Sequence, residues 1–321
     1  MDLRAAFRSG GRRPGRRSLR ARRSSLRDRA EHALFAGTSA FLSRLSPEAA
    51  SRLGGGMARL YVRLAPSRRK ILLGNLSAAF PELPSREIAA LARASLENFG
   101  AAFLEFLNSP RLSRQEIEDR VSVTGAEHLE AARARGKGVF LLSAHFGNWE
   151  LGAVRAGLLG HPIASVMRPL DNPRLEEELA WRRTRFGNRL IRKKQAAREI
   201  LRALRDGGSV AIMIDQNVLP GEGVFVPFFG RLAATSPSLA LLQMKTDAAV
   251  VPAFAWPQGK GRYRLTFEEP IVAAEFEPAG GRDERIERAT ARFMAVTENA
   301  IRRDPSAWLW MHNRWRTRPP Q

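Results

Sequence analysis

A histidine and a glutamate follow one of the most apolar stretches of the chain. His145 and Glu150 lie in the segment HFGNWE, after residues 138–144 (GVFLLSA). On one continuous helix their side chains would point roughly 140° apart. If instead a strand ends near His145, Gly147 turns the chain and Asn148 caps a helix, Glu150 can face the imidazole from the first helical turn.

A carboxylate bound to one imidazole nitrogen fixes the tautomer and raises the basicity of the other nitrogen. The spacing therefore predicts that His145, oriented by Glu150, removes a proton from a substrate hydroxyl. The alternative is a histidine at a strand end without catalytic role and a glutamate that is favourable near a helix N-terminus.

Three further polar side chains come directly after apolar runs. Arg168 follows residues 163–167, and Asp215 and Gln216 follow residues 209–214. Carboxyl ends of parallel strands meet at the ligand crevice of an α/β sheet. We expect Arg168 to bind a phosphate of the substrate or a developing oxyanion, unless it is a surface arginine. Asp215 and Gln216 are expected to support the site or to bind the substrate that carries the hydroxyl. Asn148, in the segment HFGNWE, is also expected to bind substrate. Asp215 as the base is a weaker alternative, because a pKa near 4 suits neutral pH poorly.

The apolar runs also predict the fold class. Strands are expected at 121–123, 138–144, 163–167, 209–214 and 250–254, with an edge or antiparallel strand at 263–267. Helices are expected at 126–135, 173–185, 196–205, 236–245 and 282–303, after a helical first part that reaches residue 117. Alternation of this kind is typical of an α/β protein with a mostly parallel central sheet covered by helices.

A group of apolar residues lies between two of these elements. Phe228 and Phe229, next to Pro227 and Gly230, are followed by Thr235. We expect them to form a wall of the site or of a substrate channel. A loop that packs in the core is an equal alternative for the two phenylalanines.

The composition excludes several chemistries. The chain of 321 residues has no Cys, which excludes disulfides, thiolate nucleophiles and thiolate metal sites. It has no His-Glu-x-x-His, no P-loop and no Gly-x-Gly-x-x-Gly fingerprint, so no metal, ATP or NAD is expected. The absence of a Gly-x-Ser-x-Gly elbow favours direct transfer without a covalent enzyme intermediate.

The net charge of +21 calls for a polyanionic partner. Residues 1–29 contain eleven Arg and two acidic residues, and are predicted to be a disordered arm. Residues 30–65 are predicted to be a helical membrane-associating segment, and 66–318 the catalytic domain. The apolar run at 33–42 is too short to span a bilayer, which favours an interfacial helix over a core helix or a cleaved signal.

The C-terminal segment is also rich in arginine and tryptophan. Its residues are Trp308, Trp310, Arg314, Trp315, Arg316 and Arg318. Such side chains favour a membrane interface, so an interfacial position is expected.

Taken together, six stretches resemble one known family. They are residues 69–83 (RKILLGNLSAAFPEL), 145–150 (HFGNWE), 167–175 (MRPLDNPRL), 203–217 (ALRDGGSVAIMIDQN), 223–242 (GVFVPFFGRLAATSPSLALL) and 310–319 (WMHNRWRTRP). In order and spacing they resemble the bacterial lipid A late acyltransferases, the lauroyl and myristoyl transferases, which share a His-x4-Asp/Glu motif with glycerolipid acyltransferases. The resemblance covers roughly residues 30–318 and implies a glycerolipid-acyltransferase-like fold.

The resemblance also implies an activity. His145 would be the general base, Glu150 its partner and Arg168 the family's arginine. The acyl donor would be a thioester on acyl carrier protein, the acceptor a hydroxyl of a lipid A precursor or related glycolipid, and no cofactor would be needed. The enzyme would work at the inner (cytoplasmic) membrane, with its site on the cytoplasmic side and no specific nucleic acid as partner. The alternatives are acylation of another glycolipid or a phosphatidylinositol mannoside, and a non-catalytic protein that binds polyanions or nucleic acid.

Overall fold

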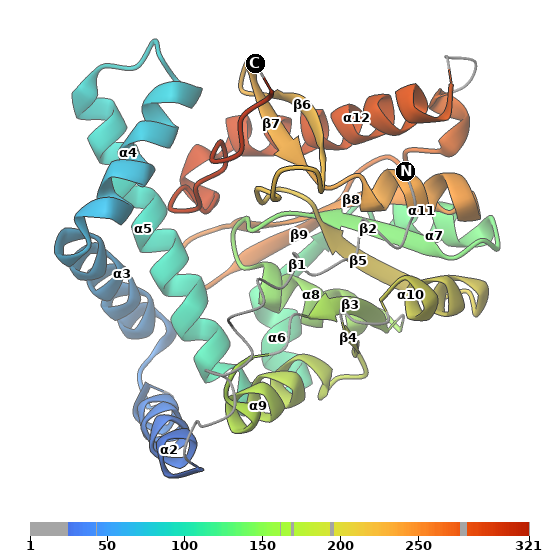
Figure 1. Ribbon diagram of the computed structural model, residues 1–321. Helices are drawn as coiled ribbons and strands as arrows, with labels where there is room; N and C mark the ends of the chain where they lie inside the picture. Colours follow the sequence, from blue (N-terminus) through green and yellow to red (C-terminus); the bar gives the residue numbers. More distant parts are fainter. Residues whose placement is uncertain are drawn as a thin grey trace.

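The protein is built around a seven-stranded, mostly parallel sheet. The computed structural model describes residues 25–42, 44–160, 162–167, 170–192, 196–276 and 281–320. The strand order is β1-β9-β8-β2-β5-β3-β4 (Figure 1). The strands are β1 (Val121–Thr124), β2 (Val139–Ser143), β3 (Ile163–Met167), β4 (Arg189–Arg192), β5 (Ser209–Met213), β8 (Ala249–Pro257) and β9 (Tyr263–Phe267). Strands β8, β2, β5, β3 and β4 are parallel, which confirms the α/β fold class.

The reversed strand predicted at 263–267 is β9. It pairs antiparallel with β8, and β1 then pairs parallel with β9, so that β1 is the edge of the sheet. Strand β4 was not expected, because its arginines face outward and only Ile191 is buried.

The hairpin of β6 (Val224–Phe228) and β7 (Arg231–Thr235) was not expected either. Its two-residue turn, Phe229-Gly230, has φ of 50° and 69°. Positive φ at both positions is what a tight hairpin turn of this length requires.

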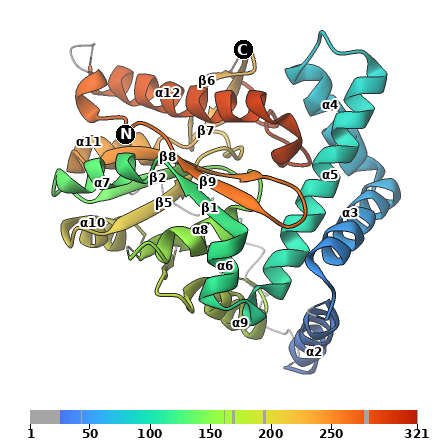
Figure 2. The same cartoon turned by 180° about the vertical axis from the view of Figure 1, so that it is seen from behind.

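Helices cover both faces of the sheet, so its central strands are apolar on both sides. Phe140 and Leu142 of β2 belong to one core cluster with residues of α10 (Ala196–Arg205), α11 (Ser238–Thr246) and α12 (Arg282–Arg303). Val139 and Leu141 belong to a second cluster with α6 (Arg114–Arg120), α7 (Ala126–Ala134) and α8 (Trp149–Gly157), seen from behind in Figure 2. The helix α9 (Pro173–Thr184) follows β3 and contacts β4.

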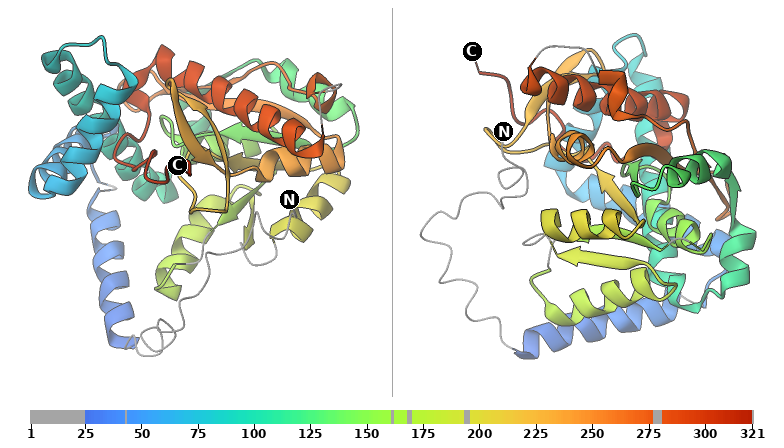
Figure 3. Two further views of the ribbon diagram at one scale, coloured as in Figure 1. Left: turned by 45° about the horizontal axis from the view of Figure 1, so that its top comes forward. Right: turned by 90° about the vertical axis from the view of Figure 1, so that its right-hand side faces the viewer.

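The first part of the chain is helical, as predicted. It comprises α2 (Ser25–Leu42), α3 (Pro47–Leu64), α4 (Pro66–Ala79) and α5 (Ser85–Asn108), which run along one side of the molecule (Figures 1 and 3). A Cβ added to Gly54 of α3 would lie 2.2 Å from the carbonyl oxygen of Gly100 of α5. Glycine at both positions therefore lets these two helices approach closely.

The segment at 30–65, which was predicted to be helical and to associate with a membrane, is helical over most of its length. Helix α2 begins at Ser25, so the prediction that residues 25–29 are disordered is wrong; an Arg27–Glu31 ion pair one turn apart supports the helix there. Residues 1–24 lie outside the described residues. In the described part of the chain, no helix is both long and apolar enough to cross a membrane.

Candidate active site

His145 lies just beyond the carboxyl end of β2, where the chain turns into α8. Gly147 makes the turn with φ of +55°, and a Cβ there would lie 1.8 Å from the carbonyl oxygen of Ala255. The side chain of Asn148 accepts a hydrogen bond from the amide of Leu151 (3.0 Å) and so caps α8. The predicted strand, glycine turn and capped helix are confirmed.

The carboxylate that binds His145 is Asp215, which follows β5. The parallel register of β2 and β5 pairs Leu142 with Ile212 and Ser143 with Met213. His145 and Asp215 each come two residues after the last of these pairs, so they lie side by side. His145 Nδ1 lies 3.0 Å from Asp215 Oδ1, and the His145 amide donates to Asp215 Oδ2 (3.0 Å). A carboxylate can only accept, so Nδ1 carries the proton and Nε2 carries the lone pair.

Asp215 is buried and has a third donor. The indole Nε1 of Trp308 donates to Asp215 Oδ2 (2.9 Å). Burial alone would raise the pKa of Asp215, but the charge of His145 and the hydrogen bonds from His145 and Trp308 outweigh it and hold that pKa well below its ordinary value. Asp215 is therefore ionised at neutral pH.

The pKa of His145 rises in turn. Burial lowers it, but the charge and hydrogen bond of Asp215, and then the charge of Glu150, outweigh burial and raise this pKa above its ordinary value. An imidazole of this kind is a stronger base than a free one and holds a proton well once it has taken it.

Two further side chains contact the imidazole. Gln216 Nε2 lies 3.2 Å from His145 Nε2, so the side-chain amide can donate to the ring lone pair. The ring of Trp149 meets the imidazole edge-on, with ring centroids 5.2 Å apart. The structure thus brings Asp215 and Gln216 to His145, as their place after an apolar strand predicted.

Glu150 is bound to a different partner. Its carboxylate accepts from Nε (2.9 Å) and Nη2 (2.5 Å) of Arg183 on α9, and Arg183 also stacks on Phe106 (5.5 Å). Glu150 makes no described hydrogen bond to His145, although its charge contributes to the raised pKa of that histidine. The spacing argument placed Glu150 correctly in the first turn of α8, but did not foresee that an arginine would bind it there.

Asn148 was predicted to bind substrate, and the structure gives it another role. It is buried, and besides capping α8 its amide donates to Glu105 of α5 (3.0 Å). Burial raises the pKa of Glu105, while hydrogen bonds from Tyr263 and Asn148 lower it by less. Both polar atoms of Asn148 are therefore occupied within the protein.

The predicted wall residues are part of the core. Phe228 and Phe229 are buried and contact Trp308 and Trp310, with ring centroids 5.5 Å and 5.6 Å apart. The hydroxyl of Thr235 donates to the carbonyl oxygen of Ala233 (3.0 Å) and accepts from Arg314. The core-packing alternative, rather than a substrate-facing wall, describes the two phenylalanines, and the hydroxyl of Thr235 is bonded within the protein.

The prediction of an interfacial C-terminal segment is wrong. Trp308, Trp310, Arg314 and Trp315 are all buried. Residues of this segment bind the turn at His145: the amide of Gly147 donates to Ala307 O (2.8 Å) and that of Leu309 to His145 O (3.1 Å). Packing against the aromatic hairpin buries these residues instead of exposing them to lipid.

Arg168 lies outside the described residues. Trp308 and Arg183 were not predicted as site residues, because they are distant from His145 in sequence and no local spacing links them to it. Trp149 was not predicted either, although it lies only four residues after His145. Within the described ranges, no three His, Asp or Glu side chains are grouped as a metal site would require.

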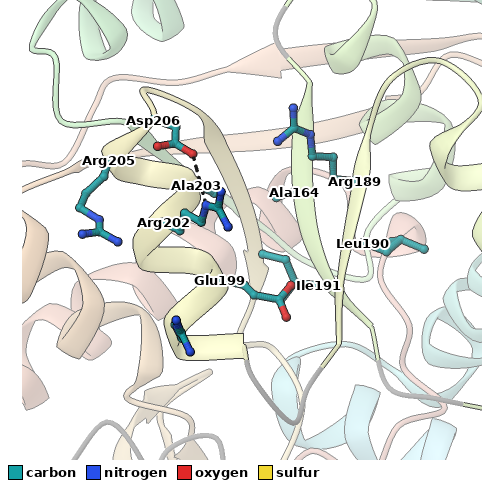
Figure 4. A pocket seen from close by; sticks show the side chains of 10 residues that line it. Ala164, Arg189, Leu190, Ile191, Glu199, Arg202, Ala203, Arg205 and Asp206 are labelled. Carbon is teal, nitrogen blue, oxygen red and sulfur yellow. Dashed lines mark ion pairs between the residues drawn. The ribbon is translucent and has the colours of Figure 1, made fainter.

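A groove of about 780 Å³ lies elsewhere, between α10 and β4 (Figure 4). Among its lining residues, Ala164 and Arg189 lie near the amino ends of β3 and β4, and Asp206 precedes β5. His145 follows the carboxyl end of β2, so this groove is separate from the crevice that holds the imidazole.

Comparison with known proteins gives concordant matches. A family model described as bacterial lipid A biosynthesis acyltransferase matches residues 21–317. The lipid A biosynthesis lauroyltransferase of Escherichia coli K12 is 30% identical over 271 residues, 84% of this chain and 85% of its own. The myristoyltransferase of the same organism is 27% identical, over 84% and 80%.

Two further matches are more distant or shorter. A phosphatidylinositol mannoside acyltransferase of Mycobacterium tuberculosis is 29% identical over 58% of this chain and 61% of its own. Among solved structures, the 1-acyl-sn-glycerophosphate acyltransferase of Thermotoga maritima has a TM-score of 0.36 and 14% identity, covering 84% of this chain and 98% of its own.

Proposed function

The chain belongs to the bacterial lipid A biosynthesis acyltransferase family, and on that premise we propose that it acylates a hydroxyl of a lipid A precursor with His145 as the general base. One observation carries the choice of base. The Nδ1–H of His145 is held by a buried, ionised Asp215, which leaves the lone pair of Nε2 directed at the place where Gln216 now donates. An acceptor hydroxyl that replaced the Gln216 amide would be in hydrogen-bonding position for proton transfer.

The proposed reaction is a direct transfer. Nε2 of His145 takes the hydroxyl proton while the hydroxyl oxygen attacks the carbonyl carbon of an acyl thioester. The tetrahedral intermediate collapses with cleavage of the carbon–sulfur bond, and the imidazolium returns the proton to the departing thiolate. Asp215 keeps the ring in one tautomer and stabilises the imidazolium, as the aspartate of a serine-protease triad does.

Two predicted residues keep proposed roles beside this pair. Glu150 would stabilise the imidazolium through its charge, at longer range than Asp215. Arg168, the residue directly after β3 in the sequence, would bind an acceptor phosphate or the oxyanion. Neither role needs a cofactor or a metal.

The net charge of the chain supports proposals for the acyl donor and for the location of the enzyme. We propose a fatty acyl chain on acyl carrier protein as the co-substrate, because an acidic carrier is attracted to a chain of net charge +21. The same excess of positive charge suits the anionic cytoplasmic face of the inner membrane. The match to a phosphatidylinositol mannoside acyltransferase supports one alternative acceptor class, a mannosylated lipid.

The test is acyl transfer by the detergent-solubilised protein. Acyl carrier protein loaded with defined fatty acids serves as donor, and a phosphorylated, tetra-acylated lipid A precursor as acceptor. His145→Ala should lower kcat by at least about 10²-fold, the usual contribution of a general base. His128→Ala, a histidine on α7 outside the site, is the matched control and should act like the wild type.

Equal activity of His145→Ala and wild type would refute the assignment of the base. If the wild type forms no product with the precursor but does with a mannosylated phosphatidylinositol, the acceptor assignment fails and the acyltransferase assignment stands.

A further inference from the structure

A basic groove lies at one edge of the central sheet. It is the groove of about 780 Å³ between α10 and the strands β3 and β4, and we call it the α10–β4 groove (Figure 4). Two acidic residues line it, Glu199 and Asp206. Four arginines line it as well, one at the start of β4 and three on α10: Arg189, Arg198, Arg202 and Arg205.

Most of these arginines are not neutralised within the protein. Arg189, Arg198 and Arg205 are exposed, and their side chains make no ion pair or hydrogen bond in the described part of the chain. Arg202 lies 4.0 Å from Asp206, and both side chains are largely exposed, so this pair contributes little. Guanidinium groups that gather around one groove repel each other, and an anionic occupant would remove that repulsion.

The sequence that builds the groove is strongly basic. Residues 182–205 contain ten basic residues and one acidic residue. Outside residues 1–29, most of the excess positive charge of the chain lies in this stretch. A surface with such a concentration of one charge attracts partners of the opposite charge and speeds their encounter.

The free edge of the sheet narrows the choice of occupant. Strand β4 ends the strand order, and no described strand pairs with its outer side. Arg189 and Arg192, both exposed, place positive charge along this edge. Charged side chains on an edge strand oppose the addition of another strand. A folded acidic surface therefore fits the groove better than an extended peptide does.

The lining also argues against other polyanions. None of the ten described residues that line the groove is aromatic, whereas sites for single-stranded nucleic acid use aromatic rings to stack the bases. Glu199 and Asp206 would repel a continuous row of phosphates, and a bilayer surface does not fill a concave groove. An acidic protein surface can place separate carboxylates opposite the arginines and avoid the two acidic residues.

One end of the groove approaches the end of the sheet that holds the base. Helix α10 begins shortly after the carboxyl end of β4 and leads to the amino end of β5. Its first turn, which includes Arg198, therefore lies toward the carboxyl ends of the parallel strands. His145 follows the carboxyl end of β2, and β2, β5, β3 and β4 are successive neighbours in the sheet. A partner in the groove is thus beside the crevice without filling it.

We infer that the α10–β4 groove is the docking surface for the acidic protein that carries the acyl donor. The arginines hold the carrier at the edge of the sheet, and its acyl thioester, on a flexible arm, reaches the crevice at His145. This inference rests on the proposed function, which takes acyl carrier protein as the co-substrate. Its first test does not depend on turnover, since binding of the carrier can be measured without catalysis.

The first experiment measures the Kd of the detergent-solubilised full chain for acyl carrier protein that bears a stable, amide-linked acyl chain. Arg189→Glu/Arg198→Glu should raise this Kd at least about tenfold, because it reverses two charges of the groove and breaks no described side-chain contact inside the protein. The matched control is Arg264→Glu/Arg288→Glu, which reverses two exposed arginines on β9 and α12 and lowers the net charge equally. The control should bind like the wild type, and both should bind more weakly at high salt.

Three outcomes would overturn the docking surface. The first is an unchanged Kd of Arg189→Glu/Arg198→Glu. The second is an equal loss of binding in both double variants, since the attraction would then depend on net charge alone. The third is an unchanged Kd for the carrier together with lost binding to phosphatidylglycerol vesicles or to single-stranded RNA, which would assign the groove to a lipid surface or to nucleic acid.

The second experiment separates docking from catalysis. With acyl carrier protein as the donor, Arg189→Glu/Arg198→Glu should raise the KM for the donor about tenfold and leave kcat little changed. With acyl-pantetheine, a thioester donor without the protein, its KM should equal that of the wild type. An equal loss of activity with both donors would refute a docking role. Absence of product from the wild type with both donors would instead refute the proposed function and leave the measured Kd values standing.

Discussion

Asp215 at the end of β5 and Glu150 in the first turn of α8 are both acidic groups whose charge raises the pKa of His145, but they are held differently. Asp215 is buried and receives hydrogen bonds from the side chain and amide of His145 and from Trp308. Glu150 is partly exposed and accepts hydrogen bonds from Nε and Nη2 of Arg183. The comparison shows that the other groups bound to a carboxylate decide how well it orients and stabilises a neighbouring base. Its distance from that base in sequence matters less.

A carboxylate that is already paired with arginine stabilises a nearby imidazolium less than an unpaired carboxylate does. The guanidinium of Arg183 neutralises the charge of Glu150, and two hydrogen bonds fix its direction. The described ion pair of Asp215 is with His145 itself. A proton that arrives on Nε2 is therefore stabilised mainly by Asp215.

The largest expected effect separates the two carboxylates directly. Asp215→Asn should lower kcat by about 10³-fold or more, because an amide can stabilise the wrong tautomer and carries no charge for the imidazolium. Glu150→Gln should lower kcat by about tenfold, since its charge acts at longer range. Single-turnover rates with saturating donor measure both. A larger loss of kcat for Glu150→Gln than for Asp215→Asn would reverse the comparison. It would support Glu150 as the partner of His145, as the spacing predicted.

The pH dependence sharpens the comparison. The base must be neutral, so kcat/KM should rise with pH through the pKa of His145, which is raised above that of a free histidine. Removing a nearby negative charge lowers the pKa of a histidine, so the acid limb should move to lower pH in both variants. The shift should be larger in Asp215→Asn than in Glu150→Gln. A shift to higher pH in either variant would contradict the assigned electrostatics.

The smallest expected effect concerns the indole that holds Asp215. Trp308→Phe keeps most of the buried ring but removes the donor to Asp215 Oδ2, so it should destabilise the fold by about 1–2 kcal/mol. It should lower kcat less than tenfold, because His145 still binds the carboxylate. Chemical denaturation and steady-state rates measure the two effects. If Trp308→Phe were as inactive as Asp215→Asn, the indole would be the main support of the carboxylate.

The sequence predicted most of the sheet from the continuity of its apolar runs. Residues 138–144 and 209–214 read clearly as strands because both faces of β2 and β5 are covered by helices. Strand β4 and the hairpin at Phe229-Gly230 were missed, since outward arginines and an internal proline interrupt their apolar patterns. For the hairpin, the residue pair Phe229-Gly230 indicated a turn, whereas the two strands beside it had no clear apolar pattern.

The pairing of His145 with Asp215 could not be predicted, although both residues were singled out. Each was expected at a strand end, but the order of strands in a sheet is a long-range property that spacing does not report. Once β2 and β5 are neighbours in register, the contact between His145 and Asp215 follows. His145 and Glu150 are close in sequence, so their spacing suggested that they form a pair. Asp215 is 70 residues from His145, and no spacing suggested that contact.

The contacts of the C-terminal segment with the turn at His145 have a consequence for the order of events during synthesis. Residues 307–309 bind the backbone of 145–147 and, through Trp308, Asp215, across sequence separations of 93 to 164 residues. Contacts of such separation form late in folding, because the chain between them must first be ordered. A nascent chain emerges from its N-terminal end, so His145 and Asp215 leave the ribosome well before the residues that fix them. Catalytic competence should therefore appear only after residues 307–309 have left the ribosome.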